Sequence, residues 1–191
     1  MIIREIYRQT LHIIFGIIVA FSVLYIGKAP LILPLFILIL IGILLYYYLK
    51  EHYIPIISDL LNMCGRDNEC GKGAILFAIG LLITLIIIED INSAFYSILV
   101  FAIGDGLATL IGVRGKLKIK YFGKTIEGFL AFFISACIIL YYPYGMYGII
   151  VAFIGACVEF VSKKIKIDDN LILPVLIAII LEYINKYGLL K

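Results

Sequence analysis

One stretch of the chain concentrates residues that could do phosphate chemistry. From Gly104 to Gly128 it reads GDGLATLIGVRGKLKIKYFGKTIEG, with an acid near each end, Asp105 and Glu127. Between these acids lie five cations, which are Arg114, Lys116, Lys118, Lys120 and Lys124. Lysine and arginine neutralise a polyphosphate while carboxylates hold the divalent metal that bridges its oxygens, and phosphoryl transfer requires both. Taken alone, the basic loop is explained by membrane topology and by anionic lipid headgroups; beside the acids it predicts a site for a metal and a phosphate chain.

Further acids lie in apolar surroundings elsewhere in the chain. Glu159 is near the end of a later apolar run, Asp168, Asp169 and Asn170 begin the last run, and His12 lies near the start of the first. An ionisable group inside a membrane span costs roughly 2.5–3.5 kcal/mol on insertion scales, so it usually faces a cavity or a partner. We expect these groups to lie at similar depth and to converge on one cavity. The alternative is that the acids sit on helix-packing faces and are neutralised by nearby lysines.

The elements that must position these residues are apolar helices. The chain has 191 residues, of which 64% are hydrophobic and 15% charged, against about 45–50% and about 25% in soluble domains. Apolar runs bounded by charges, Gly and Pro predict seven membrane-spanning helices, at about 9–27, 31–49, 73–89, 93–113, 125–142, 145–162 and 171–187. The predicted fold class is an all-α polytopic transmembrane helix bundle, with residues 1–191 as a single integral membrane domain.

The distribution of cations predicts the orientation of the bundle. With seven spans and a cytoplasmic N-terminus, thirteen Lys and Arg residues fall on the cytoplasmic side and three on the other. Cytoplasmic loops of membrane proteins carry such an excess of Lys and Arg. We therefore expect cytoplasmic loops at about 50–72, 114–124 and 163–170, a C-terminus outside, and a multi-pass protein of the cell membrane whose site faces the cytoplasm.

The longest of these loops carries apolar residues at helical spacing. Ile54, Ile57 and Leu61 recur opposite Ser58 and Asn62. The pattern predicts a short helix lying on the membrane interface. It serves either as a connector with an apolar face or as a lid over a lipid substrate.

The acids and the basic loop together resemble the signature of the CTP-dependent polyprenol kinases, which include dolichol kinase, phytol kinase and the CTP-dependent diacylglycerol kinase. The family pattern is Gly-Asp, a glycine seven residues after the aspartate, and then Lys-Ser or Lys-Thr with Glu-Gly. The matching residues here are Asp105, Gly112, Lys124, Thr125, Glu127 and Gly128. Two flanking elements are also similar, at Arg8–His12 and at Glu159–Pro174. Gln9 departs from the pattern, because the family usually has lysine there.

The resemblance implies a membrane lipid kinase that transfers the γ-phosphate of CTP to the hydroxyl of a polyprenol or another long-chain lipid alcohol, with Mg²⁺ as cofactor. The implied catalytic residues are Asp105, Lys124 and Glu127. The implied metal ligands are Asp105, Glu127, Glu159 and Asp169. The residues expected to bind the nucleotide are Gly104, Gly112, Arg114, Lys116, Thr125, Gly128 and Asn170. Arg8 and His12 are expected to close the site from the first helix.

Two other functions stay open. Cytidylyltransferases that act on lipid phosphates also carry a Lys-x-x-x-Gly element near acids, and they release pyrophosphate instead of CDP. An ion-coupled transporter would use Asp105, Glu127 and Glu159 as a relay, although all three are expected on one side of the membrane. We expect a lipid alcohol, a nucleotide and anionic membrane lipids as partners, and no nucleic acid. The acceptor alcohol and the oligomeric state are not readable from the sequence.

Overall fold

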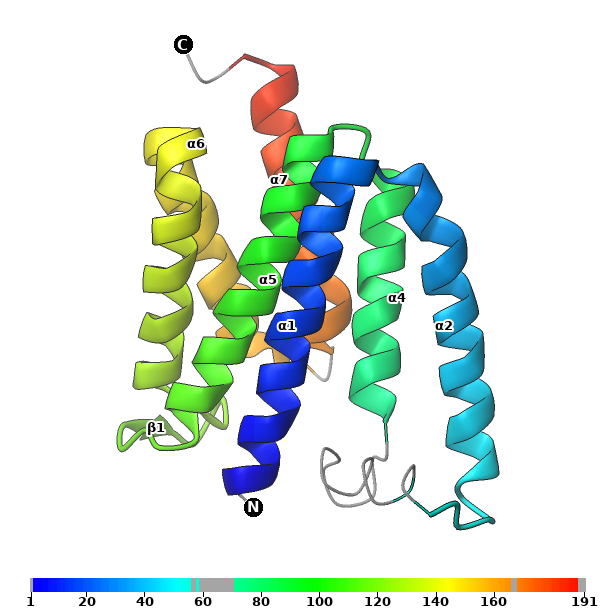
Figure 1. Cartoon of the computed structure of the whole chain (residues 1–191). Coiled ribbons are helices and arrows are strands. Elements are labelled where there is room, and N and C mark those ends of the chain that lie inside the picture. Colours follow the sequence, from blue (N-terminus) through cyan, green and yellow to red (C-terminus); the bar gives the residue numbers. More distant parts are fainter. Residues whose placement is uncertain (1, 56–57, 59–70, 166–167, 189–191) are drawn as a thin grey trace.

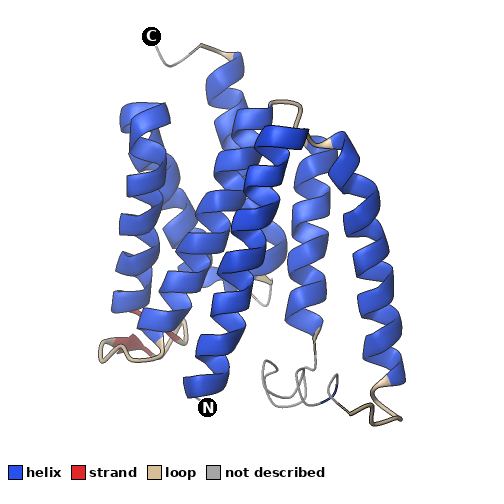
Figure 2. Cartoon of the chain, viewed as in Figure 1, coloured by secondary structure: helices blue, strands red, loops and turns tan. Residues whose placement is uncertain are grey.

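The described part of the protein folds mainly into α-helices (Figure 1, Figure 2). The computed structural model describes residues 2–55, 58, 71–165 and 168–188. The elements in chain order are α1 (Ile2–Ile26), α2 (Ala29–Tyr48), α4 (Lys72–Ile87), α5 (Ile91–Gly112), β1 (Lys118–Ile119), β2 (Lys124–Thr125), α6 (Ile126–Ser162) and α7 (Asp169–Lys186). The predicted all-α class is confirmed over the described ranges, with one pair of two-residue strands as its exception.

Four of these helices are long and apolar enough to cross a membrane. They are α1, α2, α5 and α6. Helix α4 is apolar as well, but it has only 16 residues. The helix boundaries agree with the predicted apolar segments to within a few residues, except that the first helix begins nearer the N-terminus and that two predicted segments fall in α6.

Helix α6 consists of two arms. Gly145 interrupts it with a φ of 54° and a ψ of −131°, a backbone conformation that glycine adopts without steric cost. The chain turns back at this point (Figure 1), and Phe129 and Phe133 of the first arm contact Phe153 of the second. The predicted boundary between two helices at 142–145 therefore coincides with a reversal of the chain.

Helix α5 is the centre of the bundle. It packs against α1, α6 and α7, and it buries small residues along its length, which lets its neighbours approach closely. A side chain at Gly106 would collide with Ile13 of α1. A Cβ at Gly128 of α6 would lie 2.8 Å from the carbonyl oxygen of Ala108. The spacing of the helices around α5 thus depends on these glycines.

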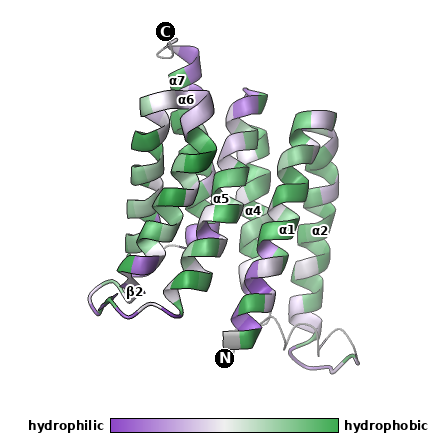
Figure 3. Ribbon diagram, turned by 60° about the vertical axis from the view of Figure 1, so that its left-hand side comes forward, coloured by the Kyte–Doolittle hydropathy of each residue, from purple (hydrophilic) through white to green (hydrophobic). Residues whose placement is uncertain are grey.

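The outer surface of the bundle is largely apolar. Large hydrophobic side chains such as Leu44 of α2 and Ile138 of α6 are exposed. Hydrophobic colouring runs along the helices, and hydrophilic residues gather in the N-terminal part of α1 and at the start of α6 (Figure 3). Such a surface is typical of helices that contact lipid rather than water.

Most of the expected site lies toward one end of the bundle. The N-terminus and the β1–β2 hairpin lie at this end, and the C-terminus lies at the other (Figure 1). The interfacial helix predicted around residues 54–64 falls mostly outside the described residues.

Candidate functional site

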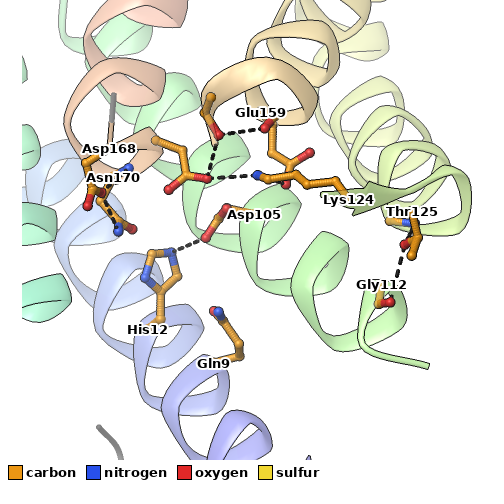
Figure 4. A network of polar contacts seen from close by, with 12 residues as sticks. Gln9, His12, Asp105, Gly112, Lys124, Thr125, Glu159, Asp168 and Asn170 are labelled. Carbon is orange, nitrogen blue, oxygen red and sulfur yellow. Dashed lines mark hydrogen bonds and ion pairs between the residues drawn. The ribbon is translucent and has the colours of Figure 1, made fainter. Parts of the chain in front are cut away.

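Three carboxylates from three helices meet inside the bundle. Asp105 of α5, Glu159 of α6 and Asp169 of α7 each place a carboxylate oxygen within 4.8 Å of the others. We call these three residues the acid cluster (Figure 4). Asp105 and Glu159 are almost fully buried, with 5% and 4% of their surface exposed. The predicted convergence of distant acids on one site is therefore observed for these three.

Lys124 neutralises part of this charge. Its Nζ donates hydrogen bonds to Glu159 at 2.5 Å and to Asp169 at 2.9 Å. Burial lowers the pKa of the Lys124 ammonium, but Asp169, Glu159 and Asp105 raise it by more, so that the pKa lies above its ordinary value. Lys124 therefore stays protonated at physiological pH. One ammonium nevertheless faces three carboxylates, so the cluster keeps excess negative charge when they are ionised.

The β1–β2 hairpin delivers Lys124 to the cluster. The strands are antiparallel with Ile119 opposite Lys124, and Gly123 closes the turn with a φ of 68°. The hairpin rests on the end of α6, where Phe122 packs on Phe160 with ring centroids 5.0 Å apart. The basic stretch at 114–124, expected as a plain loop, is thus partly a positioned β-hairpin.

Helix α1 contributes a polar face next to Asp105. The Nε2 of His12 lies 3.8 Å from Oδ2 of Asp105, and the His12 ring stacks on Phe77 at 4.1 Å. Arg8 donates a hydrogen bond to Glu5 at 2.5 Å. Arg8 Nε, Gln9 Oε1 and His12 Nε2 are buried and have no hydrogen-bond partner among the described residues. Both residues predicted to approach from the first helix lie near Asp105. His12 Nε2 lies beside its carboxylate, and Arg8, which is hydrogen-bonded to Glu5, acts electrostatically on both His12 and Asp105.

Glu127, which is expected to share a metal with Asp105, is not one of the three acids of the cluster. Its carboxylate accepts hydrogen bonds from the backbone N–H groups of Lys116 at 2.7 Å and Leu117 at 3.0 Å. These contacts hold the base of the hairpin against the first turn of α6. Because α6 begins immediately after β2, the carboxylate of Glu127 in its first turn lies beside these backbone N–H groups of the hairpin base.

Several residues expected to bind a nucleotide lie at the contact between α5 and α6. Thr125 Oγ1 donates to the carbonyl oxygen of Gly112 at 3.3 Å and accepts from the N–H of Gly128 at 3.3 Å, which caps the N-terminus of α6. A Cβ at Gly104 would lie 3.1 Å from the Phe132 ring of α6. These contacts give each residue a structural role at a helix junction.

The remaining predicted contacts lie around the cluster. Arg114 and Lys116 have exposed side chains at the base of the hairpin. The side-chain amide of Asn170 donates to Oδ1 of Asp168 at 2.8 Å, and Asp168 also accepts from the backbone N–H of Asn170, which caps α7. Asn170 follows Asp169 directly, so this cap fixes where Asp169 enters the cluster.

Two further residues of this region were not predicted as site residues. Ser162 donates to Oδ2 of Asp169 at 3.0 Å, and it lies three residues after Glu159, so both share one face of α6. The three-residue spacing between Glu159 and Ser162 could have identified Ser162 from the sequence. Gln9, which stood out in sequence only as a departure from a pattern, is 3% exposed, and only its environment distinguishes it.

The donor set of the acid cluster fits a divalent cation. Carboxylate oxygens are hard ligands, which suit Mg²⁺ or Mn²⁺ rather than metals that prefer thiolate or imidazole. The excess of carboxylates over ammonium groups supplies the charge that such an ion requires. The unpartnered, buried His12 Nε2 beside Asp105 is a further polar group directed at this position.

The fold and the site together define an all-helical protein with four helices of membrane-spanning length and a buried acid cluster near one end. The chain belongs to the same family as uncharacterized protein MJ1137 of Methanocaldococcus jannaschii, to which it is 66% identical over 180 residues, or 94% of each chain. It is also 34% identical to uncharacterized protein RP860 of Rickettsia prowazekii over 126 residues, or 61% of each chain. No family model matches the chain, and no solved structure matches it.

Proposed function

We propose that this protein is a metal-dependent lipid kinase that transfers the γ-phosphate of CTP to the hydroxyl of a polyprenol or another long-chain lipid alcohol. The observation that carries the proposal is the acid cluster with Lys124 hydrogen-bonded to two of its carboxylates. Carboxylates for a divalent cation beside a lysine for phosphate oxygens are the groups that phosphoryl transfer uses. The choice of CTP and of a lipid alcohol rests on the sequence resemblance.

In this proposal each group of the cluster has a distinct task. Glu159 and Asp169 would hold Mg²⁺, which would supply charge neutralisation at the phosphate oxygens, and Asp105 would be either a third ligand or the acceptor of the hydroxyl proton. Lys124 binds oxygens of the transferred phosphoryl group. The substrate hydroxyl oxygen forms a bond to the γ-phosphorus, and the bond between this phosphorus and the β–γ bridging oxygen breaks. CDP leaves, and the hydroxyl proton passes to a cluster carboxylate, for which Asp105 beside His12 is our candidate.

The proposal includes seven membrane spans with a cytoplasmic N-terminus and the C-terminus outside. The two arms of α6 count as two spans, and the shorter α4 and α7 complete the number. Two observations support this arrangement. The N-terminus and the hairpin lie at the same end of the bundle, and an excess of cations is expected on that side. The site then opens toward the cytoplasm, where nucleotides are found.

Purified protein in lipid nanodiscs tests the reaction directly. It is supplied with CTP labelled at the α- or the γ-phosphate, together with a polyprenol or a lipid phosphate. We expect the γ-label in the lipid, CDP as the second product, and loss of transfer when EDTA removes divalent metal. Asp105→Asn should abolish transfer, and Asp90→Asn, at the opposite end of the bundle, is the matched control that should retain it.

Other outcomes would replace the proposal. Transfer of the α-label with release of pyrophosphate would make the protein a cytidylyltransferase. Nucleotide-independent ion uptake into proteoliposomes, lost in Asp105→Asn, would make it a transporter.

A further inference from the structure

Gln9 has an unused hydrogen-bond acceptor inside the protein. The residue is 3% exposed, and its Oε1 is buried with no hydrogen-bond partner among the residues that the structure describes. Gln9 and His12 are three residues apart on α1, so they share the helix face that lies next to Asp105 (Figure 4). A buried polar atom without a partner is unfavourable, and a ligand that supplies the missing partner removes the penalty.

The neighbours of Gln9 determine which end of its amide is free. Its Nε2 points to Oε1 of Glu5 at 3.4 Å. A carboxylate only accepts hydrogen bonds, so the amide nitrogen belongs on this side and the amide oxygen on the other. The Arg8 hydrogen bond to the same Glu5 oxygen holds this carboxylate in place. Gln9 therefore offers the lone pairs of Oε1 toward the site.

The free lone pair restricts the chemistry of the group it can bind. Phosphate oxygens carry no hydrogen to donate, so they are not partners for Oε1. The reacting hydroxyl of a lipid must lie at the acid cluster, whereas Gln9 lies nearly one helical turn beyond His12 toward the N-terminal end of α1. That end is shared with the basic hairpin (Figure 1). If the phosphates of a nucleotide bind at Lys124, its sugar and base are the groups that can extend to α1.

We propose that Oε1 of Gln9 accepts a hydrogen bond from the nucleoside part of the nucleotide, either from the amino group of the base or from the ribose 2′-hydroxyl. This inference rests on the proposed function. It also gives the departure from lysine a consequence, because an amide acceptor at this position selects the nucleoside where a lysine would bind phosphate.

Competition binding tests the assignment without turnover. Labelled CTP bound to the purified protein in Mg²⁺ is displaced by CTP, by UTP, which lacks the amino group, and by 2′-deoxy-CTP, which lacks the 2′-hydroxyl. We expect the wild type to prefer CTP by about tenfold over one of the two analogues, which identifies the donor. Gln9→Leu should reduce that preference to near one. Thr10→Val, on the exposed face of α1, should retain it.

Three results would overturn the role of Gln9 while leaving the kinase proposal intact. They are wild-type binding with equal affinity for all three nucleotides, a preference that survives in Gln9→Leu, and an equal loss of affinity for every nucleotide in that variant. A change confined to the KM for the alcohol would assign Oε1 to the lipid and would also overturn it. Failure of the wild type to bind any nucleotide would overturn both proposals. Gel-filtration profiles and melting temperatures of the variants distinguish these outcomes from misfolding.

Discussion

The two ends of the bundle each hold a network of polar side chains, and the networks differ in how their charge is balanced. At the end with the C-terminus, Oδ2 of Asp90 accepts hydrogen bonds from the N–H and the Oγ of Ser93, both at 2.7 Å, and from Asn185 at 2.8 Å. At the other end, three carboxylates share one lysine. Acids that accept hydrogen bonds from neutral donors are sufficient to hold helices together. Helix packing alone does not explain a group of three acids that has only one lysine to neutralise it.

The Asp90 network has the features of a helix cap. Asp90 is the N-cap of α5, and Asn185 ties it to α7 and reaches Tyr144 at 3.3 Å. Glu182 of α7 accepts from the N–H of Asp90 at 2.9 Å. Partial burial raises the pKa of Asp90, but the hydrogen bonds from Ser93 and Asn185 lower it by more, so the ionised form is favoured. Beside the acid cluster, in contrast, α1 carries buried polar atoms that have no hydrogen-bond partner in the described part of the chain.

The largest effect is expected from Asp105→Asn. Rates of lipid phosphorylation should fall by about a thousandfold, because a group that acts on the reacting atoms is lost. The melting temperature should not fall, since the substitution removes one of three neighbouring negative charges. Initial rates and thermal unfolding in detergent measure both quantities. A loss of activity that merely follows a loss of folded protein would place Asp105 with the structural acids.

Lys124→Met should lower the stability of the protein. It leaves Glu159 and Asp169 buried without their cation, which costs about 3 kcal/mol in comparable cases. Because the pKa of Lys124 is raised, its contribution to stability is present below its ordinary pKa of about 10.4 and is lost only as pH rises through the higher folded value. We therefore expect a lower melting temperature at neutral pH, partly restored by added Mg²⁺. No restoration by Mg²⁺ would argue against a metal among these carboxylates.

Asp90→Ala should lower stability by about 1 kcal/mol, since a helix cap is lost, and should leave the rate per folded molecule unchanged. The lowered pKa of Asp90 means that its contribution is present above its ordinary pKa of about 3.9 and is lost as pH falls through the lower folded value. The difference in melting temperature between wild type and variant should accordingly shrink in acid. A rate reduced at full folding would extend the active site across the bundle.

Thr125→Val tests whether Thr125 binds a nucleotide or joins helices. Loss of the cap on α6 should cost about 1 kcal/mol. Binding of CTP, measured by equilibrium dialysis, should change by less than about threefold, because a lost neutral hydrogen bond acts on the site through the position of Lys124 alone. A much larger loss of affinity would return Thr125 to the nucleotide site.

The smallest effect is expected from Glu127→Gln. Its contacts to Lys116 and Leu117 are made at the hairpin base, so the affinity for Mn²⁺, measured by electron paramagnetic resonance, should stay at the wild-type value. Asp169→Asn, the matched change within the acid cluster, should weaken Mn²⁺ binding by more than about tenfold. Equal losses in the two variants would show that Glu127 is a ligand after all.

Much of the fold follows from local patterns in the chain. Apolar runs of sufficient length must satisfy their backbone groups internally, so they predict helices wherever they occur. Pro143 and Gly145 mark the reversal inside α6 because neither continues a regular helix at low cost. The acids also stand out in sequence, because a carboxylate in an apolar run needs a partner.

The sequence by itself therefore determined the helical class, the approximate helix boundaries and the candidate acids. Only the tertiary structure decided which candidates meet. Glu159 and Asp169 join Asp105 because the second arm of α6 and the start of α7 pack around α5, whereas Glu127 turns to the backbone of the hairpin. Lys124 enters the cluster through the register of two short strands. Helix crossings and hairpin register are set by contacts between distant residues, and these leave no local pattern in the chain.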